Sequence, residues 1–322
     1  MSPELWDRLH DDLVLLASLE PEESQEPPWR AGLDAAFSGG ADGVVIGVRG
    51  NDPPMVVKLP YELSDIALAP SVPRKGILLR ELPAIAQGCR DRDLLCVVRP
   101  EDDAALKGLS QPFAALFIPS EQVTNLPFLE RAAAIGAALL VGSGMASTEE
   151  IGETVQTVRR RHGQVVLLHE AGRGWARPGG INLRAIPALG ERFGCPAGWV
   201  MDDEQSTLTL AAVALGARVV IYPGSLGAES QRRLVDETRA VRRALGSGGK
   251  SLHEIDWTPR DSQYRSIVAG VDIPRGGILR PEMLTTAPPG IGLKPRLLPS
   301  LVGRRAAVDI ARGTLITLVM VE

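Results

Sequence analysis

Cysteine is scarce in this sequence, and the few cysteines present do not build a site. The 322 residues include three cysteines, Cys89, Cys96 and Cys195, an odd and scattered set. None of them lies in a CxxC or CxxH spacing, so a structural zinc site is not expected. Such a set is typical of reduced thiols that behave as small buried hydrophobic residues, and it favours a cytoplasmic protein.

Long apolar runs and a strong net charge are missing as well. No stretch reaches the ~18 apolar residues of a membrane span. Residues 1–7 lack the basic start and apolar core of a signal peptide. The net charge is −4, which gives no electrostatic reason to expect nucleic acid or an anionic membrane as a partner. Short arginine clusters such as 159–161 lie beside acidic residues in helical patterns, and we interpret them as solvated surface.

What the sequence does contain is a series of eight short, nearly continuous apolar runs, each followed by an amphipathic segment. Continuous apolar runs are typical of parallel strands that are covered on both faces. The runs are 13–19, 43–48, 94–99, 114–118, 138–141, 165–169, 197–200 and 219–222. The clearest helices are expected from Thr148 (with Ser147 or Thr148 as N-cap), over 207–214 and over 229–245.

Eight strand–helix units predict a (β/α)8 barrel. The main alternative is an open, doubly wound sheet, which rarely has eight evenly spaced units without a nucleotide fingerprint. The composition changes after Gly246, where 247–263 is expected to be a flexible linker. Its Gly-Gly-Lys-Ser stretch is not a phosphate loop, because a helix precedes it and no helical pattern follows. Residues 264–322 alternate short β-like runs with Gly and Pro turns. The predicted organisation is therefore a barrel over 1–246, a linker over 247–263 and a small β-rich domain over 264–322.

Several motifs in the right order resemble those of the N-acetylneuraminate (sialic acid) synthases. In the barrel these are Val123–Leu129, Gly144–Ile151, Ile181–Pro187 and Leu210–Ala217. In the C-terminal part, the segments Arg265–Val268, Asp272–Gly276, Pro289–Leu293 and Asp309–Thr314 resemble the antifreeze-like SAF domain of those enzymes. The resemblance runs from about residue 112 to residue 322, and more faintly back to residue 30. It implies a TIM barrel followed by a small β-rich SAF (β-clip) domain.

The resemblance also implies a defined chemistry. The family condenses phosphoenolpyruvate with an N-acylmannosamine-type aldehyde to give a nine-carbon acidic sugar. A divalent metal polarises the aldehyde, lysine ammonium groups and hydroxyls hold the phosphate, and a carboxylate manages protons. An arginine reaches the sugar from the SAF domain of a neighbouring subunit.

Most of these groups are replaced in this sequence. The family's two metal histidines fall on Asp202 and Pro223, and two of its lysines fall on Val45 and Phe117. The fourth-strand serine is kept as Ser120. The eighth-strand glutamate and the SAF arginine are replaced by Ile221 and Pro288. We therefore expect no metal, no cofactor and no condensation of the family's kind.

Polar side chains remain at the expected carboxyl ends of the strands, where barrel chemistry takes place. The candidates for catalysis are Ser120, Ser143, His169, Glu170, Asp202 and Asp203, and the candidate for substrate binding is Arg173. His169 with one of the two aspartates could form a new metal or acid–base pair. Alternatively, His169 is a rim histidine with its hydrogen bonds satisfied, and the acidic run 202–204 caps the next helix. Arg173 could hold a carboxylate or phosphate, or be solvated.

Two functions stay open at this point. The first is a non-catalytic relative, a pseudoenzyme that acts as a regulatory or partner subunit in nonulosonic acid or surface carbohydrate biosynthesis. The second is an enzyme of altered chemistry on a sugar or another small carbonyl compound. A polar and accessible barrel mouth would favour the second, and one filled by Phe117, Trp199 and Tyr222 would favour the first. The resemblance further implies a homodimer with exchanged SAF domains, or a heterodimer with an intact synthase, with a small sugar as a candidate ligand.

Overall fold

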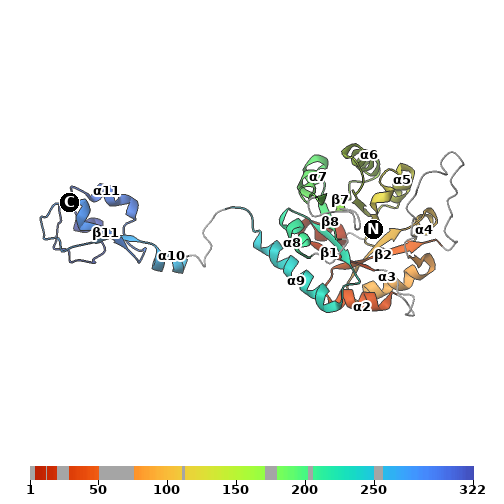
Figure 1. Ribbon diagram of the computed structural model, residues 1–322, viewed down its shortest axis with the longest axis horizontal. Coiled ribbons are helices and arrows are strands. Elements are labelled where there is room, and N and C mark those ends of the chain that lie inside the picture. The colour runs from red at the N-terminus through yellow and green to blue at the C-terminus, as the bar shows by residue number, and fades with distance from the viewer. Residues whose placement is uncertain are drawn as a thin grey trace. The chain divides into compact units, whose positions relative to one another are not determined.

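The computed structural model describes residues 4–11, 13–19, 29–50, 76–110, 113–170, 180–201, 206–249 and 257–322. The chain divides into two compact units, Met1–Gly246 and Ser247–Glu322 (Figure 1). Among the described residues, no helix is long and apolar enough to cross a membrane.

Eight parallel strands form the barrel of the first unit. They are β1 (Val14–Leu19), β2 (Gly43–Arg49), β4 (Leu95–Pro100), β5 (Ala115–Ile118), β6 (Ala138–Gly142), β7 (Val165–Glu170), β8 (Ala197–Val200) and β9 (Val219–Pro223). Each strand pairs with the next in sequence, and β1 pairs with both β2 and β9, which closes the sheet. A short strand, β3 (Ile77–Leu78), pairs with the end of β2. The barrel and the positions of all eight predicted strands are confirmed.

Helices surround these strands (Figure 1). They are α1 (Glu4–Asp11), α2 (Arg30–Ser38), α3 (Leu82–Arg90), α4 (Asp103–Gly108), α5 (Leu126–Ala134), α6 (Thr148–Arg159), α7 (Ala185–Phe193), α8 (Ser206–Ala214) and α9 (Ala228–Ala244). The N-cap of α6 is Ser147, in a capping box with Glu150, as its sequence predicts. Short 3-10 helices lie at Leu79–Glu81 and Ser120–Gln122 in this unit, and at Pro281–Met283, Pro295–Leu297 and Leu318–Met320 in the second.

The barrel has an inner core of side chains that point between the strands and an outer core between strands and helices. The inner core includes Val45, Val97 and Phe117. Leu5 and Leu9 of α1 join it, and an Arg218 Nη2 hydrogen bond to the carbonyl of Leu9 ties this helix to the start of β9. Helix α1 was not predicted from the sequence, and it covers the amino-terminal end of the barrel. Active sites of this fold lie at the opposite end, where the strands finish.

The second unit is built around a two-stranded antiparallel sheet, β10 (Ser266–Ala269) and β11 (Leu284–Ala287), with α10 (Trp257–Gln263) and α11 (Leu298–Leu301). Its own small core includes Ile267, Leu279 and Ile316.

The flexible linker expected over 247–263 differs from the structure in its last residues, which form α10. A proline is tolerated in the first turn of a helix, so Pro259 does not prevent α10 from forming. The Gly290 N–H donates to the carbonyl of Asp261 at 2.7 Å. A side chain at position 290 would lie 2.5 Å from Cβ of Tyr264, so glycine is needed for this close packing. Residues 250–256 of the expected linker lie outside the described part.

Candidate active site at the barrel rim

The last inward-facing positions of the strands form the carboxyl-terminal rim of the barrel. Side chains alternate along a strand, so the residues two positions after the inner core residues Val45, Val97, Leu140, Leu168 and Ile221 also face inward. They are Gly47, Arg99, Gly142, Glu170 and Pro223, which we call the rim layer. Among these five described residues, Arg99 is the cation and Glu170 the carboxylate, while the two glycines and the proline carry no charge.

The cation of the rim layer is held in an ion pair. Arg99 is buried, at 2% exposure, and its Nε donates to Oε1 of Glu101 at 2.6 Å. The pair lies across Gly47 of β2: a Cβ at that position would contact the Glu101 carboxylate and lie 2.9 Å from Arg99 Nη2. Glycine is required here because any side chain would displace the pair. Arg99 was not among the predicted site residues, although its position two residues after the apolar Val97 places it on the same face of the strand.

The turn after Arg99 is fixed by the aspartate that follows the pair. Asp102 is the N-cap of α4, and its Oδ1 accepts from the N–H of Ala105 at 2.6 Å. Its Oδ2 accepts from the N–H of Gly50 at 2.9 Å. The end of β2 and the first turn of α4 are thereby joined through the carboxylate of the residue that follows Glu101.

Three of the predicted candidates, Ser120, Ser143 and Glu170, gather at the ends of neighbouring strands. The Glu170 carboxylate lies against Gly142. A Cβ on Gly144 would lie 3.3 Å from Ser120 Oγ and 3.1 Å from Glu170 Cβ. Ser143 is buried, and its hydroxyl donates to the carbonyl of Leu168 at 3.1 Å. A carboxylate beside a hydroxyl could exchange protons with a bound ligand.

His169 faces the other way. Because Leu168 and Glu170 point inward, the residue between them points toward the helices. Its ring lies 5.7 Å from that of Trp199, and its Nε2 lies 2.7 Å from the carbonyl of Ile181. The imidazole is therefore engaged away from the rim layer. The other candidates, Asp202, Asp203 and Arg173, lie outside the described residues.

The aromatic residues expected to fill the mouth divide between the two cores. Phe117 and Val45 both lie in the inner core, whereas Trp199 and Tyr222 belong to the outer core. Tyr222 is fully buried, and burial raises the pKa of its hydroxyl. This hydroxyl donates a hydrogen bond to Gln231 Oε1 at 3.5 Å. The barrel is thus apolar below the rim layer, while the rim layer itself carries charged groups.

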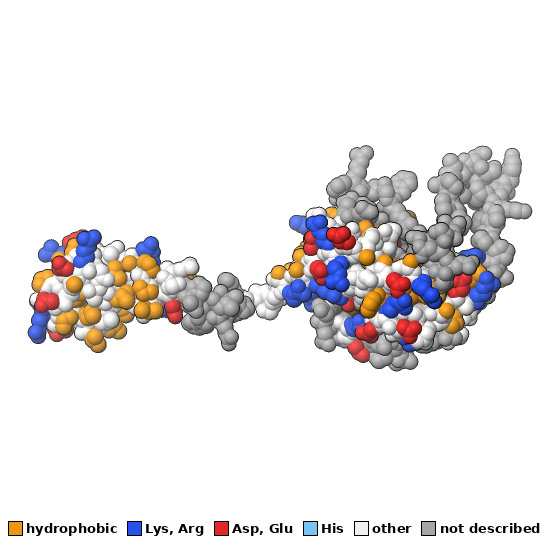
Figure 2. Space-filling view, turned by 90° about the horizontal axis from the view of Figure 1, so that it is seen from below, with side chains coloured by type: hydrophobic (Ala, Val, Ile, Leu, Met, Phe, Trp, Pro, Cys, Tyr) orange, Lys and Arg blue, Asp and Glu red, His pale blue; other side chains and the backbone are white. Residues whose placement is uncertain are grey.

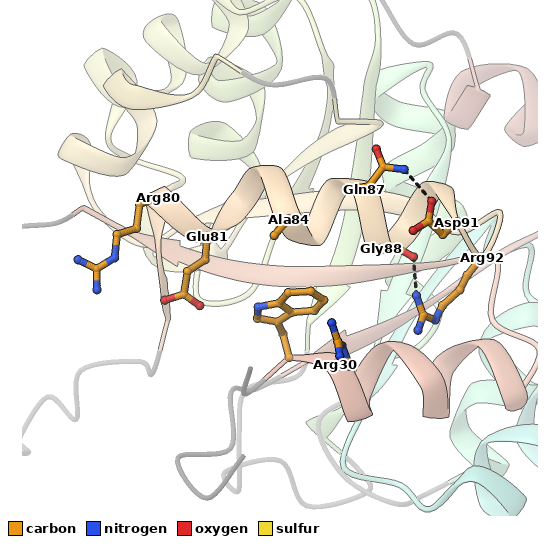
Figure 3. Close-up of a pocket in the computed structure, with 9 residues that line it drawn as sticks. Arg30, Arg80, Glu81, Ala84, Gln87, Gly88, Asp91 and Arg92 are labelled. Carbon is orange, nitrogen blue, oxygen red and sulfur yellow. Dashed lines mark hydrogen bonds between the residues drawn. The ribbon is translucent and has the colours of Figure 1, made fainter. Parts of the chain in front are cut away.

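A separate hollow of about 940 Å³ lies on the outer surface between α2 and α3 (Figure 3). Its lining includes Trp29, Arg30, Arg80 and Arg92. Arg92 is engaged: it donates to the Asp34 carboxylate at 2.6 Å and to the carbonyl of Gly88 at 3.0 Å. This hollow lies in the helix layer and shares no residue with the rim layer.

The described residues do not fit the divalent metal that the family resemblance implies. Pro223 stands at the end of β9, paired with Ser18 of β1, and a proline side chain has no donor atom for a metal. Within the described ranges, no group of three or more His, Cys, Asp or Glu side chains could hold a metal ion.

Purified and dialysed protein is expected to contain far less than one equivalent of manganese or zinc. The reason is that Pro223 offers no ligand and that His169 is bonded to Ile181. Elemental analysis of the full chain measures this directly. One equivalent of metal that is lost in a Glu170→Gln or His169→Ala variant would contradict the expectation.

Two segments of the chain match models of known protein families. Residues 75–221 match the NeuB family and residues 264–322 match the SAF domain. The N,N'-diacetyllegionaminic acid synthase of Legionella pneumophila is 29% identical over 217 residues, which are 62% of this chain and 61% of that protein. The N-acetylneuraminate-9-phosphate synthase of Homo sapiens is 29% identical over 225 residues, 65% of this chain and 63% of that protein. The chain therefore matches less than two thirds of the length of these relatives.

The fold has counterparts among solved structures. The N-acetylneuraminic acid (sialic acid) synthetase of Leptospira borgpetersenii superposes with a TM-score of 0.65 at 19% sequence identity, covering 77% of this chain and 90% of that one. At this level of identity the likeness supports the barrel architecture alone.

Proposed function

Because the chain belongs to the NeuB family, as a diverged member with a C-terminal SAF domain, we propose that it acts in nonulosonic acid or surface carbohydrate biosynthesis without condensing phosphoenolpyruvate. In this proposal it is a regulatory or partner subunit. Its relatives include sialic, legionaminic and pseudaminic acid synthases, which supports this pathway class.

The observation that carries the proposal is the apolar character of positions 45 and 117. Val45 is fully buried and Phe117 is 3% exposed, and both pack in the inner core. The resemblance places a lysine at each position. A charge-assisted hydrogen bond contributes about 1.5–3 kcal/mol, so the loss of two such groups weakens the binding of a phosphate severely. Arg99 supplies one cation at the rim, but its pairing with Glu101 leaves that pair neutral.

A second candidate function rests on the polar groups that do remain. Glu170 and Ser120 lie together at the ends of β7 and β5, and a carboxylate next to a hydroxyl can serve as acid or base. They would suit altered chemistry on a sugar or another small carbonyl compound. In that case, turnover of such a compound should depend on Glu170 and should not require phosphoenolpyruvate.

The full chain, incubated with phosphoenolpyruvate, N-acetylmannosamine and Mn²⁺, is expected to release no more phosphate than a control without protein. The physical reason is the absence of both lysines at positions 45 and 117. An intact family synthase under the same conditions serves as the positive control. Phosphate release that disappears in a Glu170→Gln variant would contradict the proposal.

We also propose that the second unit covers a barrel rim in a dimer, either of two copies or with an intact synthase. Residues 264–322 carry eight Lys and Arg against four Asp and Glu, a net charge of +4, which leaves −8 on residues 1–263. Opposite charge favours docking of the two kinds of surface. Hydrophobic side chains also gather on the visible face of the second unit (Figure 2). Its exposed apolar residues include Ile291, Leu318 and Val319, the last at 84% exposure.

A further inference from the structure

The guanidinium of Arg99 has one engaged end and one open end. Its Nε bonds to Glu101. Within the described part of the chain, no hydrogen bond from Nη1 or Nη2 is found. The side chain as a whole is only 3% exposed. Burying a charged group leaves its remaining N–H groups in need of acceptors, so this open end is suited to a ligand.

The strand register places the open end inside the barrel. Gly47 pairs with Arg99 across β2 and β4, one inward position beyond the pair Val45 and Val97. On the other side, Val97 pairs with Ala115 of β5, and the same register continued by two residues brings Phe117 beside Arg99. The Arg99 side chain therefore lies one inward position above Val45 and Val97, with Gly47 on one side and Phe117 on the other.

We propose that Arg99 binds the carboxylate of a small organic acid, such as a 2-oxo acid or an acidic sugar, at the barrel rim. Glu101 and Gly47 act as positioning residues, because Glu101 fixes the Nε edge and Gly47 leaves room for the pair. The two terminal nitrogens of a planar guanidinium match the two oxygens of a carboxylate.

The charges at the site favour a carboxylate over a phosphate. Among the described residues of the rim layer, the charge of Arg99 is balanced by that of Glu101, whereas a phosphate dianion needs an excess of positive charge. Val45, Val97 and Phe117 next to Arg99 add no second cation. The inference rests on the proposed function, since a condensing site would use the same end of the barrel for phosphoenolpyruvate.

Isothermal titration calorimetry on the full chain tests the proposal with three probes. Pyruvate and N-acetylneuraminate carry a carboxylate, and the methyl ester of N-acetylneuraminate does not. At least one acid is expected to bind saturably, and where N-acetylneuraminate binds, its ester should bind more weakly. Arg99→Met is expected to weaken binding of the acid about 10–100-fold and to remove the preference for acid over ester. Arg92→Met is the matched control, since Arg92 is also ion-paired but lies in the helix layer, and it should leave binding unchanged.

Two further variants keep the test informative if Arg99→Met does not fold. Arg99→Lys retains the positive charge but not the two terminal nitrogens of the planar guanidinium, and it should bind the acid at least several-fold more weakly. The double variant Arg99→Met/Glu101→Met removes the pair together and should fold without binding. The proposal is overturned if neither acid binds the wild-type chain, if binding survives in these variants, or if inorganic phosphate binds more tightly than both acids. If neither acid binds and phosphoenolpyruvate is not consumed, this inference alone is refuted. If phosphoenolpyruvate is consumed, the proposed function is refuted.

Discussion

Replacing Glu101 with alanine is expected to lower the free energy of unfolding of the barrel by about 3–5 kcal/mol. The substitution removes the carboxylate that Arg99 contacts at 2.6 Å and leaves a guanidinium that is 3% exposed without this partner. Removing one member of a buried pair is costly because the other charge stays desolvated. Thermal or urea unfolding of the full chain measures the loss, at about 2–4 °C of melting temperature per kcal/mol for a unit of this size.

The control for this experiment is an exposed ion pair of the same barrel. Glu130 contacts Arg160 at 3.4 Å, and both side chains are more than half exposed, so Glu130→Ala should change the free energy by less than about 1 kcal/mol. The double variant Arg99→Met/Glu101→Met should recover most of the loss, since no unpaired charge remains. Equal effects of Glu101→Ala and Glu130→Ala would show that Arg99 does not depend on the pair.

The full chain is expected to form a dimer of about 69 kDa, twice its mass of 34.4 kDa, when light scattering is measured at low salt. The charge difference between residues 264–322 and the rest of the chain should make the dimer weaker at 1 M salt, where the screening length falls from ~10 Å to ~3 Å. The double variant Leu318→Asp/Val319→Asp should also dissociate it, because these exposed side chains are proposed to be covered in the dimer. Phe37→Asp serves as the control, because Phe37 is also an exposed hydrophobic residue but lies on α2 of the barrel. This variant should leave the mass unchanged. A monomer of about 34 kDa, both alone and with an intact synthase from the same cell, would contradict this proposal.

The strands could be predicted from the sequence because parallel strands covered on both faces are apolar throughout. The run 138–141 illustrates this, since it coincides with β6 except for the added Gly142. Helix α1 could not be predicted in the same way: its buried residues, Leu5 and Leu9, give only two apolar positions on one face.

The site was only partly predictable, for two physical reasons. His169 and Glu170 were grouped because both are polar and both end a strand, but adjacent strand residues point to opposite faces. Only Glu170 reaches the rim layer. Arg99 was not predicted because it is a new charge at a strand end, whereas the resemblance draws attention to family positions that have lost their charge. The pairing of Arg99 with Glu101 over Gly47 depends on the register of β2 and β4, which composition alone does not give.

The claim that this barrel no longer condenses phosphoenolpyruvate is tested most directly under single-turnover conditions. Phosphorus NMR would follow phosphoenolpyruvate mixed with an excess of the full chain, N-acetylmannosamine and Mn²⁺, so that even one slow turnover per site is visible. The account predicts that the phosphoenolpyruvate signal persists as it does without protein. Conversion of the added phosphoenolpyruvate to inorganic phosphate, abolished by Glu170→Gln, would contradict it.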